Sequence, residues 1–218
     1  MKRFLTLAMV AVLAMALLAV VAMPVSTKPA TQHVYVAQLD PLNNSGVHGT
    51  AFFVLQGRVL WSFTTASGLT PDQVHMQHIH GFASGANATC PPLSADTDND
   101  GIISLVEGLP FYGPVLVPLT PYPTASSAGM FVYAHVFRGM QLKPLRLGSV
   151  GLTHRVVVVH GMMVNGTYDM TVPVACGEIL GVREPHYMTR EKRRELACDG
   201  RTVAVPAPRV VADRPLRR

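Results

Sequence analysis

The stretch VHGTAFFVLQGRVLWSFTTAS, residues 47–67, decides the fold class. Valine, phenylalanine, threonine and tryptophan fill both halves and QGR separates them, which is typical of two antiparallel strands joined by a tight turn. Similar segments lie around it: HVYVAQLD precedes it, and VHMQHIHG, MFVYAHVF, HRVVVVHG and TYDMTVPVACGEIL follow. None of these segments keeps a helical period. The sequence therefore predicts an all-β protein, an antiparallel sandwich or barrel.

The start of the chain is typical of an export signal. An apolar run over residues 4–23 follows Lys2 and Arg3 and ends before Pro24. A run of about 20 apolar residues is also long enough to cross a bilayer, so cleavage near residue 23 and an uncleaved membrane anchor both stay open. In either case we expect the body outside the cytoplasm, in a periplasm, in the extracellular space or anchored at the outer side of a membrane.

Charge divides the rest of the chain into a β domain and a tail. We assign residues 24–32 to a linker, 33–182 to the domain and 183–218 to a basic, disordered tail. The tail carries ten Lys or Arg and five Asp or Glu, whereas residues 1–182 carry eight of each. The domain thus lacks a charge excess that would neutralise phosphates, which argues against nucleic acid as a partner.

The three cysteines are Cys90, Cys176 and Cys198. In an exported chain an odd number of cysteines predicts one disulfide and one remaining thiol. The spacing alone does not say which two form the pair.

Two histidines stand two residues apart in QHIHG, residues 77–81. Alternate residues of a strand point to one face, so His78 and His80 lie together with Met76, and His75 lies opposite. His160 ends the apolar run VVVV and places a further imidazole at a strand end. Imidazoles gathered in this way can hold a metal ion such as copper. The alternative is that each is an ordinary hydrogen-bonded strand residue.

A proline-rich insertion over residues 82–129 contains a second metal motif, DTDNDGIISLVE at residues 96–107. The spacing reproduces the calcium loop of an EF-hand, with a glycine at its sixth position for the sharp turn. The predicted calcium ligands are Asp96, Asp98, Asp100, the Ile102 carbonyl, Ser104 and Glu107. The segment before the loop is not helical, so we expect a free-standing loop with at most one exiting helical turn. The alternative is an acidic surface turn without an ion.

The order of four motifs resembles the copper-zinc superoxide dismutase family. They are HMQHIHG, a loop cysteine, HRVVVVHG and the late VACGEILG, and the stretch GTAFFVLQGRVLWSFTTASGLTP also resembles the related chordin-type (CHRD) domain. The similarity covers residues 33–182. It implies a Greek-key barrel with a long loop insertion, copper bound by His78, His80 and His160, and a disulfide between Cys90 and Cys176. It also implies copper-dependent dismutation of superoxide as the activity.

The sequence departs from that family at two places. Residues 82–134 contain no histidine, so the zinc site and the histidine that bridges copper to zinc are missing. Met76, Met162, His135 or His48 could supply the missing copper ligand. Pro173 stands where the family keeps an arginine that attracts superoxide, unless Arg138 or Arg155 substitutes for it.

Two functions follow from these features. The first is an exported copper protein of the superoxide dismutase type, without zinc, with copper ions or superoxide as its partners and with no catalytic residue assigned. The second is a non-catalytic, calcium-stabilised binding or structural module, or a copper store. Contact with a membrane is expected only through an uncleaved N-terminal segment.

Overall fold

The computed structural model describes residues 31–145, 151–183 and 209–210. The predicted export signal, nearly all of the linker and most of the basic tail, including Cys198, lie outside the described residues. Two residues of that tail, Arg209 and Val210, form a short strand against Val182 and Arg183. Within the described part of the chain, no helix is long and apolar enough to cross a membrane.

Strands dominate the described residues. They are β1 Gln32–Pro41, β2 His48–Gln56, β3 Val59–Ser67, β4 Gln77–His80, β5 Val115–Pro118, β6 Met130–Arg138, β7 Val156–Val164, β8 Thr167–Glu178, β9 Leu180–Arg183 and β10 Arg209–Val210. The helical segments are the 3-10 turns η1 Leu93–Ala95 and η2 Gly139–Leu145 and the helix α2 Leu105–Tyr112.

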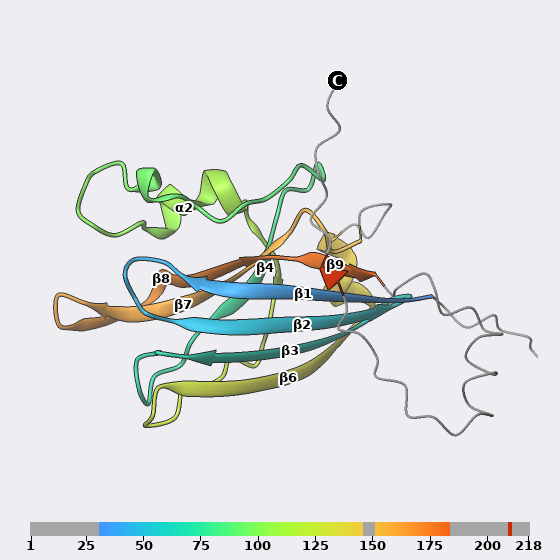
Figure 1. The fold of residues 1–218 in the computed structure, drawn as a ribbon, viewed down its shortest axis with the longest axis horizontal. Helices are drawn as coiled ribbons and strands as arrows, with labels where there is room; N and C mark the ends of the chain where they lie inside the picture. Colours follow the sequence, from blue (N-terminus) through green and yellow to red (C-terminus); the bar gives the residue numbers. More distant parts are fainter. Residues whose placement is uncertain (1–30, 146–150, 184–208, 211–218) are drawn as a thin grey trace, which may run out of the picture. The chain divides into compact units, whose positions relative to one another are not determined.

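The strands pair in the order β5-β4-β7-β8-β1-β2-β3-β6, and all pairs are antiparallel. This sheet curls into a half-barrel, with β1, β2, β3 and β6 side by side in Figure 1. Strands β1 to β3 follow one another as hairpins, β4 crosses to the other half of the sheet between β5 and β7, and β8 lies beside β1. The predicted all-β antiparallel fold is confirmed.

The main core fills the inside of the half-barrel. Alternate residues of β1, β2 and β3 are buried there, as the period of two in the sequence predicts. Leu39, Phe53, Leu60, Phe137 and Val157 are fully buried members of this core.

The insertion packs on the side of β7 and β8 that points away from the main core. A second apolar cluster forms there between Val156 and Val158 of β7 and Tyr112 of α2. The Cys90–Cys176 disulfide, with its Cα atoms 5.7 Å apart, ties the insertion to β8 and confirms the predicted pair. The insertion is more regular than expected, since it contributes β5, which pairs with β4.

Candidate metal centre

The two strands β4 and β7 bring the three predicted copper ligands together. His78 pairs with Val158 and His80 with Val156, so both histidines share the outward face of the sheet, while Ile79 points into the core. His160 lies two residues beyond Val158 on the same strand. One ring nitrogen from each histidine lies within 4.8 Å of the others.

The strand geometry changes directly after His160. The pairing of β7 with β8 shifts register on both sides of this residue, and Gly161 has a φ of 113°. A Cβ atom at Gly161 would collide with the hydroxyl of Tyr168 and touch the ring of His75. Glycine is therefore required where the chain turns away from the site.

Hydrogen bonds fix which nitrogen each ring offers. Nδ1 of His80 lies 2.9 Å from the carbonyl oxygen of Gly113, and Nδ1 of His160 lies 2.8 Å from that of Thr171. A carbonyl oxygen only accepts, so both Nδ1 atoms carry the proton and both Nε2 atoms keep a lone pair. His78 is turned the other way, with its Nε2 2.8 Å from the Tyr122 hydroxyl and its Nδ1 left over.

The three remaining nitrogens fit a metal ion. His78 Nδ1, His80 Nε2 and His160 Nε2 are buried and have no hydrogen-bond partner. Buried polar atoms without partners are rare because each costs free energy. Three nitrogens bound to one ion at about 2.0–2.1 Å lie about 3.3–3.6 Å apart. Separations within 4.8 Å would therefore have to close by up to about 1.5 Å for one ion to bind all three rings.

Burial keeps the three rings uncharged. It is the main reason that the pKa of His78 falls to about 4, with repulsion from His80 adding to it. Burial also lowers the pKa of His80 to about 4, against the opposing effect of its bond to Gly113. For His160, burial and then repulsion from His78 lower the pKa to about 3. Neutral imidazole is the form that binds metals, so the site is ready for an ion at neutral pH.

Access to the group is from the side of His78. This ring is 8% exposed, whereas His80 and His160 are each 1% exposed. Tyr122, itself half-buried, packs edge-on against His78 with ring centroids 5.5 Å apart. An ion or a small molecule would therefore reach the triad past His78 and Tyr122.

Helix α2 supports His80 from the insertion. The Tyr112 ring packs against His80 with centroids 4.7 Å apart, and the Tyr112 hydroxyl donates to the Leu105 carbonyl in the first turn of the helix. Gly113, which follows the helix, supplies the carbonyl that accepts from His80. The position of α2 thus sets the orientation of the His80 ring.

The other histidines proposed as ligands lie elsewhere. His48 is exposed on β2, and His135 packs against Phe137 on β6, with ring centroids 4.8 Å apart. Among the described residues, neither joins the triad. Half-buried Met76 directly precedes β4, and its carbonyl accepts from the backbone N–H of His160. Met162 packs against the main core.

The structure also shows where the two arginines proposed to attract an anion lie. The guanidinium of Arg155 is buried and donates to the carbonyl oxygens of His154 and Leu145, at 3.0 and 3.4 Å. Arg138 ends β6, in the other half of the sheet. Neither is bonded to a triad histidine.

The acidic loop has the form of a cation site. Carboxylate oxygens of Asp96, Asp98 and Glu107 lie within 4.8 Å of one another, and Asp100 is not part of this group. Asp96 Oδ2 accepts from the Gly101 N–H, while the buried Asp96 Oδ1 has no hydrogen-bond partner. Hydrogen bonds, the first from the backbone of Ser104, lower the pKa of Glu107 to about 2, so this carboxylate is ionised.

The segment after the loop is longer than the single turn expected. Helix α2 has eight residues, with Ser104 and Glu107 forming a capping box at its start. Two predicted ligands therefore also serve the helix: the Ser104 hydroxyl accepts from the Glu107 N–H, and Glu107 Oε2 accepts from the Ser104 N–H. The Ser-x-x-Glu spacing of a capping box marks the start of a helix and can be recognised in the sequence.

Asn43 joins the loop to the barrel. Its amide oxygen accepts from the Ile103 N–H at 2.7 Å, and its amide nitrogen donates to the carbonyl oxygens of Ile103 and Pro173. Pro173 is the residue of β8 that pairs with His160. One buried side chain thus connects the acidic loop to the strand next to the triad.

Comparison of the chain with protein-family models finds no match, and comparison with curated protein sequences finds none either. The residues that orient the triad, Gly113, Tyr122 and Thr171, were not predicted. They come from a helix end, a loop and a strand, and none of them belongs to a motif with a recognisable spacing.

Proposed function

We propose that this protein is an exported copper-binding protein in which His78, His80 and His160 hold the ion. The observation that carries the proposal is that each of the three grouped histidines has one buried ring nitrogen without a hydrogen-bond partner. The intramolecular disulfide supports export, because disulfides persist in oxidising compartments. The order of the motifs along the chain is our reason for proposing kinship with copper-zinc superoxide dismutases and chordin-type domains.

Copper is favoured over zinc by the donor set. A given nitrogen site binds Cu²⁺ more tightly than Zn²⁺, and imidazole is a ligand that suits copper. The described neighbours of the triad are phenol and backbone groups rather than the carboxylates that often complete zinc sites. A bound copper ion would supply one-electron redox chemistry.

In this proposal the three histidine side chains bind and orient the copper ion. They do not attract the superoxide anion. Gly113 and Thr171 hold two ligands in one tautomer, and the insertion shields the group on the side of α2. Arg155 is engaged by backbone carbonyls, so it does not replace the missing family arginine at the triad. The geometry therefore supports copper binding or storage ahead of dismutation, and dismutation stays a separate activity to be measured.

Titration of the metal-free protein with copper tests the proposal. We expect one tight copper ion per chain, retained against an equal amount of zinc, and loss of tight binding in His160→Ala. Dismutation is assayed on the same copper-loaded samples, with His80→Ala as the matched variant. A preference for zinc, or unchanged copper binding in His160→Ala, would contradict the assignment.

A second candidate activity is calcium binding by the loop at residues 96–107. The specific observation is the buried, unpartnered Oδ1 of Asp96, which faces a group of acidic side chains. Gathered carboxylates repel one another, and a cation offsets this repulsion. The bonds through Asn43 and α2 would pass the added order to the barrel.

Thermal unfolding with and without calcium tests this second activity. Millimolar calcium is expected to raise the melting temperature of the wild type and to leave that of Asp96→Ala unchanged, because a ligand that binds only the folded state stabilises it. The exposed loop residue Asn99 provides a control through Asn99→Ser. Equal melting curves with and without calcium in the wild type would remove the role of the loop.

A further inference from the structure

The outward face of β1, β2, β3 and β6 is the feature that the proposed function leaves unexplained. An antiparallel sheet with one face on a core normally presents polar side chains on the other. Here one row across the four strands consists of Val36, Phe52, Phe63 and Ala134, paired in register. Phe52 and Phe63 are 40% and 44% exposed and lie with their ring centroids 6.4 Å apart.

The rows on both sides continue this uncharged surface. One of them includes half-buried Trp61, the single tryptophan of the sequence, between Val54 and Val136. The other contains Gln38, Thr50 and Thr65 and ends at Val132, which is 82% exposed. None of these three rows contains a charged side chain. We call the outward residues of the four strands the outer face.

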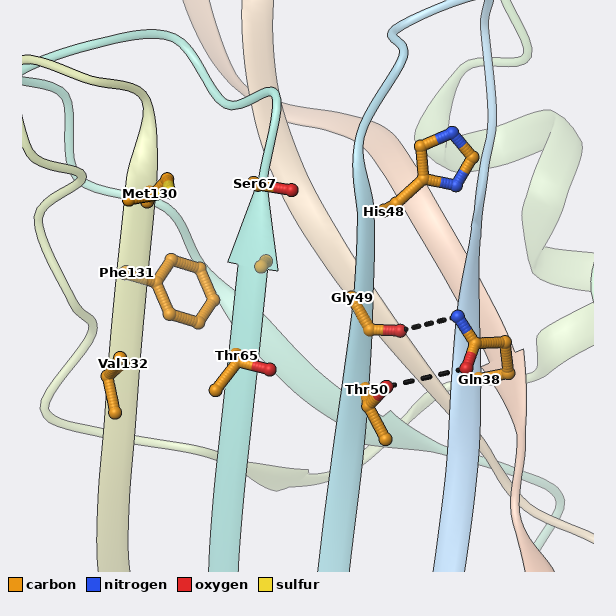
Figure 2. A pocket seen from close by; sticks show the side chains of 10 residues that line it. Gln38, His48, Gly49, Thr50, Thr65, Ser67, Met130, Phe131 and Val132 are labelled. Carbon is orange, nitrogen blue, oxygen red and sulfur yellow. Dashed lines mark hydrogen bonds between the residues drawn. The ribbon is translucent and has the colours of Figure 1, made fainter.

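Figure 2 shows the end of the outer face near Met130. Gln38 bonds to the Gly49 carbonyl and to Thr50, so its amide is held flat against the sheet. Beside it lies a shallow depression of about 330 Å³, lined by hydroxyl, amide and aliphatic groups and by the imidazole of His48. The depression is suited to receive an uncharged side chain.

We propose that the outer face binds a second copy of this chain in a two-fold symmetric dimer. Four strands about 4.8 Å apart, each with five outward residues at intervals of about 6.7 Å, present about 600 Å². Two such faces bury about 1,200 Å² where they overlap fully, the lower end of the range for specific protein interfaces, and less where their strands cross. An uncharged face needs an uncharged partner surface, and an identical copy provides one.

The charges at the rim match the same symmetry. The two charged outward side chains of the four strands are Asp40 and Arg138, in addition to the imidazole of His48. Asp40 follows Leu39, which pairs with Gly49, whereas Arg138 pairs with Val59 at the opposite end of the sheet. They therefore stand at diagonally opposite corners. A two-fold axis that lies in the plane of the face, perpendicular to the line joining these two corners, brings Asp40 of each copy to Arg138 of the other, and the strands of the two copies then cross at an angle.

Analytical ultracentrifugation of the purified full chain tests the dimer, with Trp61 fluorescence as a second readout. We expect a monomer–dimer equilibrium in the wild type, with the Trp61 emission shifting to shorter wavelength as the dimer forms. Val132→Lys is expected to weaken dimerisation about 100-fold, because it places a charge in an apolar interface. Leu93→Lys, at an equally exposed apolar residue of the insertion, serves as the matched control and should leave the dimer intact.

A charge exchange tests the orientation of the two copies. Asp40→Arg alone is expected to weaken the dimer about tenfold through like-charge repulsion, and Asp40→Arg with Arg138→Asp should restore it. A wild type that stays monomeric at all concentrations overturns the proposal and leaves the face for a different partner. A dimer that survives Val132→Lys unchanged also overturns it, because association then involves another surface.

Discussion

Lowering the pH of the metal-free protein is expected to destabilise it strongly through the histidine triad. The pKa values of His78, His80 and His160 in the folded protein are about 4, about 4 and about 3, because burial penalises the charged rings. In the unfolded chain each ring has the ordinary pKa of about 6.5. Between these values the unfolded chain takes up protons that the folded protein cannot. The free energy of unfolding therefore decreases as the pH is lowered through this window.

The size of the effect follows from the same numbers. At about pH 5 each unfolded histidine gains about 2 kcal/mol from protonation, so three together remove about 6 kcal/mol from the free energy of unfolding. That loss is comparable with the whole stability of an ordinary domain, about 5–15 kcal/mol. Above about pH 7 the three rings are neutral in both states and this effect vanishes.

Urea unfolding followed by Trp61 fluorescence measures this loss at about pH 7.5 and about pH 5. In His160→Gln we expect the difference in unfolding free energy between the two pH values to shrink by about 2 kcal/mol, because one titrating ring is gone. The pH difference is compared rather than absolute stability, since the substitution also alters packing. His33→Gln, at an exposed histidine, serves as the control. An identical pH difference in wild type and His160→Gln would refute the reasoning that burial holds this ring neutral.

Three further predictions concern the surroundings of the triad. Tyr122→Phe removes the hydroxyl 2.8 Å from His78 Nε2 and should raise the Kd for copper about tenfold in a competition titration, with the melting temperature little changed. Asn43→Ala leaves the Ile103 N–H and the Pro173 carbonyl buried without a partner and should cost about 2–4 kcal/mol in urea unfolding; a loss below about 0.5 kcal/mol would show that Asn43 does not join the loop to the barrel. Cys90→Ser opens a loop of 86 residues and should lower the unfolding free energy by up to about 4 kcal/mol relative to the oxidised wild type; equal stability would contradict the role of the disulfide.

The sequence predicted the parts of this protein that depend on periodicity. The alternation in residues 47–67 predicted the β2–β3 hairpin, and the HIH spacing predicted that His78 and His80 share one face of a strand. That His160 joins them was implied by the family resemblance, and the structure brings the three together. It failed where the structure depends on contacts between distant loops. Strand β5 has four residues and ends in a proline, so only its pairing with β4 makes it a strand.

Helix α2 shows the same limit. Pro110 and Gly108 lower the helical propensity of LVEGLPFY. The helix nevertheless forms, because a capping box starts it and Tyr112 packs in an apolar cluster with Val156 and Val158 of β7. The carbonyl and hydroxyl groups that orient the histidines likewise come from these loops. Spacing and the family resemblance predicted the candidate ligands, and only the folded chain revealed which nitrogen of each ring is left without a hydrogen-bond partner.

Electron paramagnetic resonance of the Cu²⁺-loaded protein tests the central claim most directly, because the splitting by ligand nuclei counts the nitrogens bound to the ion. The account predicts three imidazole nitrogens in the wild type and two, with much weaker binding, in His160→Ala. The same spectrum and affinity in both proteins would contradict it, since copper would then be bound outside the place where β4 and β7 meet.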